Sequence, residues 1–391
     1  MSWLLAFAGF AALVLLHELG HFVAAKAVGM RVERFSLFFP PKLIGVRRGE
    51  TEYMIGAVPL GGYVKITGMS PDEPLAPELR ARSYAGSPVW KRLVVIGAGP
   101  LMNLIVAFLI LSGLFLSQGR TIPGITVGEV EAGSPAAAVL QAGDRITGAS
   151  LRKQGTSVTL PGDTHLLTRD EAERRQTALV KAIAAGGCDA TVTGKGEGGL
   201  PQVAPCETPG TVTVTYVRDG QRGSAELTPR YDEQRERYRL GVAFDGRHEE
   251  VGVAAAAGAA LSGMWTVTRE TVTAIGKLFY DSQARKEVSG VVGSYETTRQ
   301  SISVDPILTL QIIAFISLSL AVVNLFPFLP LDGGHIFWAI VEKLRGGRPV
   351  STAILERASI VGLLLVAMLF MVGLSNDIGR ITSGQGFGIH R

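Results

Sequence analysis

The sequence predicts a polytopic α-helical membrane protein with four transmembrane helices, a membrane-associated β element and an inserted extracytoplasmic α+β domain. Only 18% of the 391 residues are charged and 47% are hydrophobic, whereas an average soluble domain is about 25% charged. The mean hydropathy is +0.28, which excludes a disordered chain and an ordinary cytosolic enzyme. Four apolar runs approach the ~20 residues that cross a ~30 Å hydrocarbon core: Trp3–Val28, Leu93–Leu116, Pro306–Phe328 and Ala358–Leu374.

The distribution of Lys and Arg predicts how these helices are oriented. Basic residues are concentrated between the first and second runs, and again between the third and fourth. Short cytoplasmic loops carry such an excess, so we expect both loops in the cytoplasm and the N-terminus, the insert and the C-terminus on the other side. The pI of about 9.1 follows from these loops, and no nucleic-acid partner is expected. The first run lacks a charged start and a cleavage site, so we expect it to be retained as a helix.

Periodicity and composition divide the chain into segments. Residues 251–279 are Ala-rich and then amphipathic, which favours a helix on the outer membrane surface over a fifth span that would break the charge topology. The expected segments are a first transmembrane helix at 1–30, a cytoplasmic β region and linker at 31–92, a second transmembrane helix at 93–117, an extracytoplasmic domain at 121–231, an extracytoplasmic amphipathic helical region at 240–305, a third transmembrane helix with its following motif at 306–335, a cytoplasmic loop at 336–357, a fourth transmembrane helix at 358–376 and a tail at 377–391.

The first apolar run contains the pattern His-Glu-x-x-His, from His17 through Glu18 to His21. Residues four apart on a helix share one face, and this spacing suits two nitrogen ligands of a tetrahedral Zn²⁺ with the glutamate as general base. Ionisable side chains inside a transmembrane helix are costly unless they face a protein interior and have a function. The alternative is a structural cluster of satisfied polar side chains.

A catalytic zinc site usually has a third protein ligand, and the candidate is Asp332. It lies in the segment 324–335, which contains two prolines and two glycines. Irregular backbone at membrane depth is tolerated where it lines a cavity or a protein interior. A carboxylate there needs a counter-charge, which a metal ion supplies. Alternatively, Asp332 caps the helix that is expected to begin near Gly334.

These two segments resemble the signatures of the site-2 protease family, membrane metalloproteases that perform regulated intramembrane proteolysis. The match extends over nearly the whole chain, and the layout is closest to the bacterial regulator of sigma-E protease branch. Supporting phrases are Gly61–Lys65, Gly99–Asn103 and Ser289–Gly293. The resemblance implies that zinc is held by His17, His21 and Asp332 and that Glu18 activates water. It also implies contacts with the substrate backbone from Asn324 and from a strand that contains Gly62, Tyr63, Val64 and Lys65.

The insert has its own resemblance. Its phrases Gly133–Ala138 and Ala142–Ile146, with the expected order of strands and helices, resemble a bacterial PDZ domain over residues 121–230. One such domain is present, where the best-known member of the branch has two. The Gly/Pro-rich loop at 186–209 is an addition to the compact pattern. It contains Cys188 and Cys206, which form either a disulfide in an oxidising exterior or two unpaired thiols.

The resemblance implies single-span membrane proteins as substrates, such as anti-sigma factors or remnant signal peptides, in the bacterial cytoplasmic membrane. The main alternative is a non-catalytic membrane adaptor that holds partners through the PDZ-like insert. A di-iron desaturase needs a larger histidine cluster, and a zinc transporter needs polar residues spread over several spans. We interpret Asn103 as a polar packing contact between spans. His335 either supports the neighbouring ligand or is an interfacial histidine, and the oligomeric state stays open.

Overall fold

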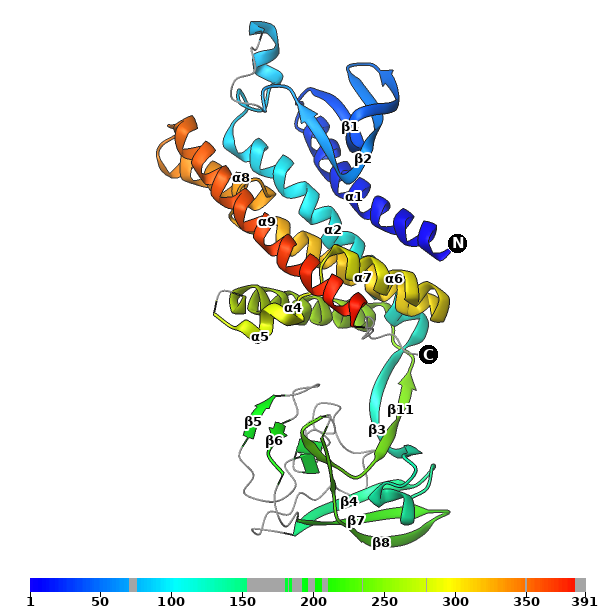
Figure 1. The fold of residues 1–391 in the computed structure, drawn as a ribbon. Coiled ribbons are helices and arrows are strands. Elements are labelled where there is room, and N and C mark those ends of the chain that lie inside the picture. Colours follow the sequence, from blue (N-terminus) through cyan, green and yellow to red (C-terminus); the bar gives the residue numbers. More distant parts are fainter. Residues whose placement is uncertain are drawn as a thin grey trace. The chain divides into compact units, whose positions relative to one another are not determined.

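A computed structural model of the chain describes residues 1–69, 76–152, 180–181, 183–184, 192–195, 201–205, 210–233, 235–278, 280–348 and 350–383. The chain divides into two compact units (Figure 1). Unit 1 consists of Met1–Ser117 and Gly252–Arg391, and unit 2 consists of Gln118–Val251.

Among the described residues of unit 1, four helices are long and apolar enough to cross a membrane. Their outward side chains are large and apolar: Leu109 is 62% exposed and Leu364 is 65% exposed. Such surfaces are stable only where lipid covers them. The predicted polytopic membrane fold is therefore confirmed, with spans α1 (Ser2–Ala27), α2 (Val89–Gln118), α7 (Pro306–Asn324) and α9 (Thr352–Thr382).

The other described helices of unit 1 pack around the four spans. Among them, α4 is not one of the four spans, and its Ala260 and Met264 pack into a core with Leu318 of α7. Helix α6 is joined to the start of α1 by a hydrogen bond in which the Tyr295 hydroxyl donates to the Trp3 carbonyl at 2.8 Å. These helices are η1 (Pro77–Arg82), α4 (Val253–Lys277), α5 (Ser282–Glu287), α6 (Val291–Val304) and α8 (Asp332–Leu344).

The β element of unit 1 follows α1 and consists of two long strands, β1 (Val32–Arg48) and β2 (Thr51–Ile66). Figure 1 shows them beside the C-terminal end of α1. Residues 42–48 of β1 and 51–56 of β2 form a hairpin around a tight turn. The sequence predicted a membrane-associated β element in this region, and its two strands are long because both continue past the hairpin.

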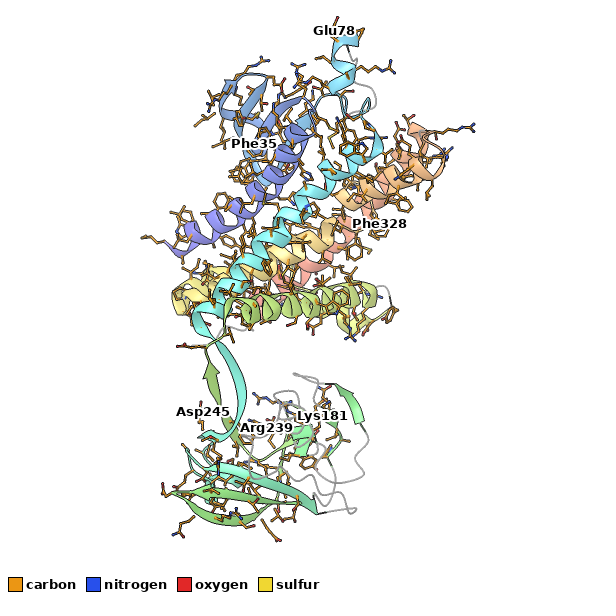
Figure 2. All side chains as sticks on the ribbon, turned by 180° about the vertical axis from the view of Figure 1, so that it is seen from behind. Phe35, Glu78, Lys181, Arg239, Asp245 and Phe328 are labelled. Carbon is orange, nitrogen blue, oxygen red and sulfur yellow. The ribbon has the colours of Figure 1, made fainter. Side chains whose placement is uncertain are left out.

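The two strands pair a second time. Residues 32–37 of β1 pair with 62–66 of β2, and part of the same β1 segment also pairs with 52–55. This part of β1 therefore lies between two parts of β2. In the described portion of the chain, 62–66 forms the outermost strand at one edge of the sheet, and 42–48 lies at the other edge. The sheet packs on α1 through the rings of Phe35 and Phe22, whose centroids are 5.2 Å apart; Phe35 is labelled in Figure 2.

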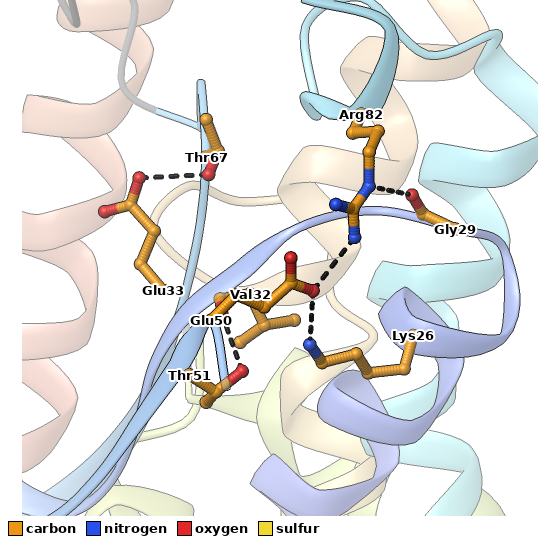
Figure 3. Close-up of polar contacts among 8 residues, drawn as sticks. All are labelled: Lys26, Gly29, Val32, Glu33, Glu50, Thr51, Thr67 and Arg82. Carbon is orange, nitrogen blue, oxygen red and sulfur yellow. Dashed lines mark hydrogen bonds and ion pairs between the residues drawn. The ribbon is translucent and has the colours of Figure 1, made fainter. Parts of the chain in front are cut away.

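A cluster of ion pairs fixes the β element to the end of α1 (Figure 3). The Glu50 Oε1 atom accepts from Lys26 Nζ at 2.6 Å and from Arg82 Nη2 at 2.9 Å, while Arg82 Nε donates to the Gly29 carbonyl at 3.5 Å. These two cations hold the pKa of the Glu50 carboxyl below its ordinary value. The strands are further joined by hydrogen bonds from Thr51 to the Val32 carbonyl and from Thr67 to Glu33.

Unit 2 is built on a five-stranded sheet in the order β11-β3-β4-β7-β8. Its core contains Val127, Ile146, Val212, Val214 and Leu227. The elements are β3 (Arg120–Val130), η2 (Pro135–Ala138), β4 (Arg145–Arg152), β7 (Thr211–Arg218), β8 (Gln221–Leu227), β11 (Val242–Glu249), and the two small pairs β5 (Val192–Lys195) with β6 (Pro201–Val203) and β9 (Arg230–Asp232) with β10 (Arg237–Arg239).

One ion pair of unit 2 is firmly held. The Asp144 side chain is buried and accepts from Arg218 Nε and Nη2, each at 2.7 Å. It also accepts from the Gln141 backbone N–H at 2.8 Å. These donors lower the pKa of the Asp144 carboxyl, the Arg218 hydrogen bonds most strongly. The pair joins the turn before β4 to the end of β7.

Candidate metal centre

The two histidines of the first span lie side by side on α1. His17 and His21 are each only 8% exposed, and their Nε2 atoms are 3.3 Å apart. The rings meet edge to face, with centroids 4.9 Å apart. One helical turn therefore presents two ring nitrogens to a single point. Glu18, between them in sequence, is half-buried.

Asp332 completes the cluster from a distant part of the chain. Its Oδ2 atom is 3.2 Å from His17 Nε2 and 3.4 Å from His21 Nε2. Asp332 is the first residue of α8, whose N-cap is Leu331, so its carboxylate faces the histidines instead of capping the helix. The structure thus brings together the three residues predicted as ligands.

The spacing of these three atoms fits a zinc ion. Nitrogen and oxygen ligands about 2.0–2.1 Å from a tetrahedral zinc lie about 3.3–3.4 Å from one another, and the three observed separations are 3.2, 3.3 and 3.4 Å. Asp332 Oδ2 is buried and has no hydrogen bond within the described chain. Burying a carboxylate oxygen in this way is costly unless a cation balances it. The residues present therefore fit a bound zinc.

Helix α2 forms a close wall behind the two histidines. The Val95 carbonyl accepts a hydrogen bond from His21 Nδ1 at 2.8 Å, which leaves Nε2 of that ring directed to the metal point. A Cβ atom on Gly99 would lie 2.2 Å from His21 Nε2 and 2.9 Å from His17 Nε2. Only glycine leaves room for both imidazoles at this position. One turn further along, Asn103 is fully buried with its Nδ2 atom 3.2 Å from His17 Nδ1.

Two consecutive glycines explain how Asp332 is aimed. A Cβ on Gly333 would lie 2.2 Å from the Leu325 carbonyl oxygen, and one on Gly334 would lie 2.5 Å from the Leu329 backbone nitrogen. The turn between α7 and α8 is therefore folded tightly against the first turn of α8. Phe328, labelled in Figure 2, belongs to this turn. The close backbone contact fixes where α8 begins, and with it the position of the carboxylate.

The β element passes directly beside the glutamate of the His-Glu-x-x-His pattern. A Cβ on Gly62 would lie 2.7 Å from Glu18 Cγ, so the backbone of the outermost strand touches this side chain. The side chains of the neighbouring residues contact β1 and not the metal centre. Tyr63 stacks on Phe39 with a centroid separation of 6.0 Å, and Lys65 forms an ion pair with Glu33 at 2.9 Å.

The side chains of Asn324 and His335 form no hydrogen bond or ion pair with this cluster in the described part of the chain. Asn324 is the last residue of α7 and is half-buried, and its side chain forms no hydrogen bond within the described residues. The His335 ring is half-buried on α8. Cys188 and Cys206, predicted as a disulfide or as two thiols, lie outside the described residues. The contacts of the Val95 carbonyl and of Gly99 with the histidines were not predicted from the sequence. The one signal for them is the small residue beside Pro100 in the second span.

The fold and the metal centre together define a class, the membrane-embedded zinc metalloproteases. The chain belongs to peptidase family M50, the site-2 protease family, whose sequence model matches residues 5–369. It is 31% identical over 388 residues to a protein of Rhizobium meliloti, covering 94% of this chain and 93% of that one. It is 29% identical over 382 residues to a Clostridium acetobutylicum protein, covering 96% of each. It is 30% identical over 397 residues to a Nostoc protein, covering 98% and 97%. All three relatives are named "Putative zinc metalloprotease".

Proposed function

We propose that this zinc metalloprotease hydrolyses peptide bonds within the transmembrane segments of single-span membrane proteins. The observation that carries the proposal is the cluster of His17, His21 and Asp332, whose ligand atoms are 3.2–3.4 Å apart and lie on and beside spanning helices. Ligands in this position support a reaction at the depth of the membrane. Membrane-protein substrates follow from the family, and regulated cleavage of anti-sigma factors or remnant signal peptides is the finer proposal.

The chemistry assigns a separate task to each side chain. His17, His21 and Asp332 hold the zinc, which when bound makes a water molecule more acidic and polarises the scissile carbonyl. Glu18 takes the proton of the attacking water and then gives it to the leaving amine. The Glu18 side chain is half-buried beside the histidines, so the proton is moved in a site that is partly shielded from solvent.

The β element offers the substrate new hydrogen-bond partners. A helix in lipid satisfies its backbone groups internally, so it must unwind before a peptide bond can be cut. A segment that adds as a strand to an exposed sheet edge regains main-chain hydrogen bonds. The outermost strand at Gly62–Val64 lies beside Glu18, and a substrate strand added there would pass the metal centre. Asn324, at the end of the helix that leads to Asp332, is proposed to hold the substrate backbone.

The proposed orientation in the membrane rests on the distribution of basic residues. The basic segments 31–92 and 336–357 support a cytoplasmic β element and an N-terminus and unit 2 outside, in a bacterial cytoplasmic membrane. His17–His21 lie in the second half of α1. The cut is therefore proposed to fall inside the membrane, nearer the cytoplasmic side.

Unit 2 is proposed to be a PDZ-like domain that selects substrates. Its sheet borders a cavity of about 220 Å³, lined by apolar side chains that include Leu140, Ile146, Val214, Leu240 and Phe244. Such a cavity suits an apolar side chain of a bound peptide. Exclusion of substrates that still carry a bulky external domain is the alternative role. If unit 2 binds a peptide segment of the substrate, an added free peptide should compete with the substrate for the cavity; if unit 2 only excludes bulky substrates, the peptide should have no effect.

The experiment is cleavage of a single-span reporter, full-length and with its external domain removed, by the purified chain in detergent. Product masses locate the bond that is cut. The proposal expects a cut inside the transmembrane segment by wild type and none by Glu18→Gln. A cut outside that segment, or equal cleavage by both proteins, contradicts the proposal. No cleavage of either reporter by a zinc-loaded wild type would favour the adaptor alternative.

A further inference from the structure

Asn103 is a polar side chain buried in the middle of a transmembrane helix. It is fully buried on α2, and its Oδ1 atom has no hydrogen-bond partner within the described residues. The Ser317 hydroxyl of α7 donates to the backbone oxygen of Asn103 at 2.9 Å, not to its side chain. The side-chain contact is with His17, whose Nδ1 atom is 3.2 Å from Asn103 Nδ2. Packing between spans therefore does not account for the amide.

The protonation of His17 decides what this contact does. His17 Nε2 faces Asp332 and His21 at 3.2 and 3.3 Å, so Nε2 is the ligand atom and must offer a lone pair. A neutral imidazole then carries its proton on Nδ1. An N–H group at Nδ1 needs an acceptor, and the amide N–H₂ group of Asn103 is a donor. A half-turn of the amide exchanges its nitrogen and oxygen and places Oδ1 at this position.

We propose that Asn103 is a positioning residue for the zinc ligand His17, with its amide oxygen accepting the Nδ1–H of His17 when zinc is bound. The proposal rests on the ligand set of the proposed function. It makes α2 the support of both histidines, because the Val95 carbonyl accepts from His21 Nδ1 at 2.8 Å. Val95, Gly99 and Asn103 recur every four residues and share one face of α2. Supporting acceptors of this kind fix the orientation of metal-bound histidines.

The test compares two substitutions of similar volume in the full-length protein in detergent. Asn103→Leu removes the acceptor, and Asn103→Asp keeps it. Zinc affinity is measured by competition with a chelator. We expect Asn103→Leu to bind zinc about 10–100-fold more weakly than wild type, and Asn103→Asp to remain within a few-fold of wild type. Ser317→Ala, which removes the hydrogen bond to the Asn103 backbone, is the matched control and is expected to keep its zinc affinity.

A packing role makes the opposite prediction, since a leucine is tolerated between apolar spans and a buried carboxylate is not. Wild-type affinity in Asn103→Leu, or equal losses in the leucine and aspartate variants, would overturn the inference. If Asn103→Leu does not fold, Asn103→Ala is judged by the same criterion. A wild type that binds no zinc at all would instead overturn the proposed function, so the two failures are distinguishable.

Discussion

Replacing Gly99 by alanine tests how closely α2 fits the metal-binding histidines. The added methyl group would lie 2.2 Å from His21 Nε2, whereas ordinary contacts begin at 3.4 Å. The ring nitrogen would therefore have to move by about 1.2 Å, and zinc–ligand distances tolerate only about ±0.2 Å. His17 Nε2, at 2.9 Å, would be displaced as well. We expect the zinc affinity of Gly99→Ala to fall by about 100-fold or more. This loss is larger than the about 10–100-fold expected when one supporting hydrogen bond to a ligand is removed.

Gly97→Ala is the matched control for this substitution. A Cβ at Gly97 meets nothing within 4 Å, and both glycines lie in the same helix. Each substitution gains a similar helix propensity, up to about 1 kcal/mol, so a difference between them reports the contact with the histidines. The assay is chelator competition for zinc, with proteolysis of the reporter as a second readout. Zinc binding by Gly99→Ala at the affinity of Gly97→Ala would refute this account of the site.

Two further predictions concern the strand beside the metal centre and the fold of unit 2. Gly62→Ala is expected to lower kcat/KM about tenfold or more with the zinc content unchanged. Its Cβ would lie 2.7 Å from Glu18 Cγ, and a small displacement of a catalytic group lowers the rate strongly. Wild-type kinetics in this variant would contradict the expectation. The pKa of Asp144 is held below its ordinary value by Arg218. The ion pair therefore contributes fully to the folding stability of unit 2 at any pH above the ordinary carboxyl pKa, and this contribution is lost as the pH falls through the lowered pKa of Asp144. Thermal unfolding of unit 2 in the full chain should show this loss of stability below about pH 4. Asp144→Asn should lower the Tm of unit 2 at pH 7 and weaken the dependence of Tm on acid pH. An unchanged Tm in Asp144→Asn would contradict a stabilising role of the ion pair.

The metal centre was predictable where local spacing determines it. The separation of His17 and His21 is set by helix geometry, and the broken segment around Asp332 indicated backbone that must line an interior. Local sequence also accounts for the hairpin of β7 and β8, because Asp219 and Gly220 adopt positive φ angles of 50° and 79° that suit such a turn.

Contacts between distant segments were not predictable from these patterns. The second pairing of β1 with β2 depends on a register that local alternation does not specify. Asn103 was interpreted as a packing contact, because the sequence does not reveal which face of α2 meets α1. The ends of the spans also differ from the apolar runs: α7 ends at Asn324, before Pro327, whereas α9 begins at Thr352 and extends to Thr382. Hydropathy reports contact with lipid and not helical hydrogen bonding, so a helix can end before its apolar run does, as α7 does, or continue past it, as α9 does.

The central claim is that a zinc-bound set of side chains works with Glu18 as its base. The most direct measurement is zinc stoichiometry and reporter cleavage in the same preparations of wild type and Glu18→Gln. The account predicts one zinc per chain in both proteins, with turnover reduced by about 10²–10⁴-fold in the variant. Loss of zinc in Glu18→Gln would make the glutamate part of the ligand set, and cleavage at the wild-type rate would contradict its role as the base.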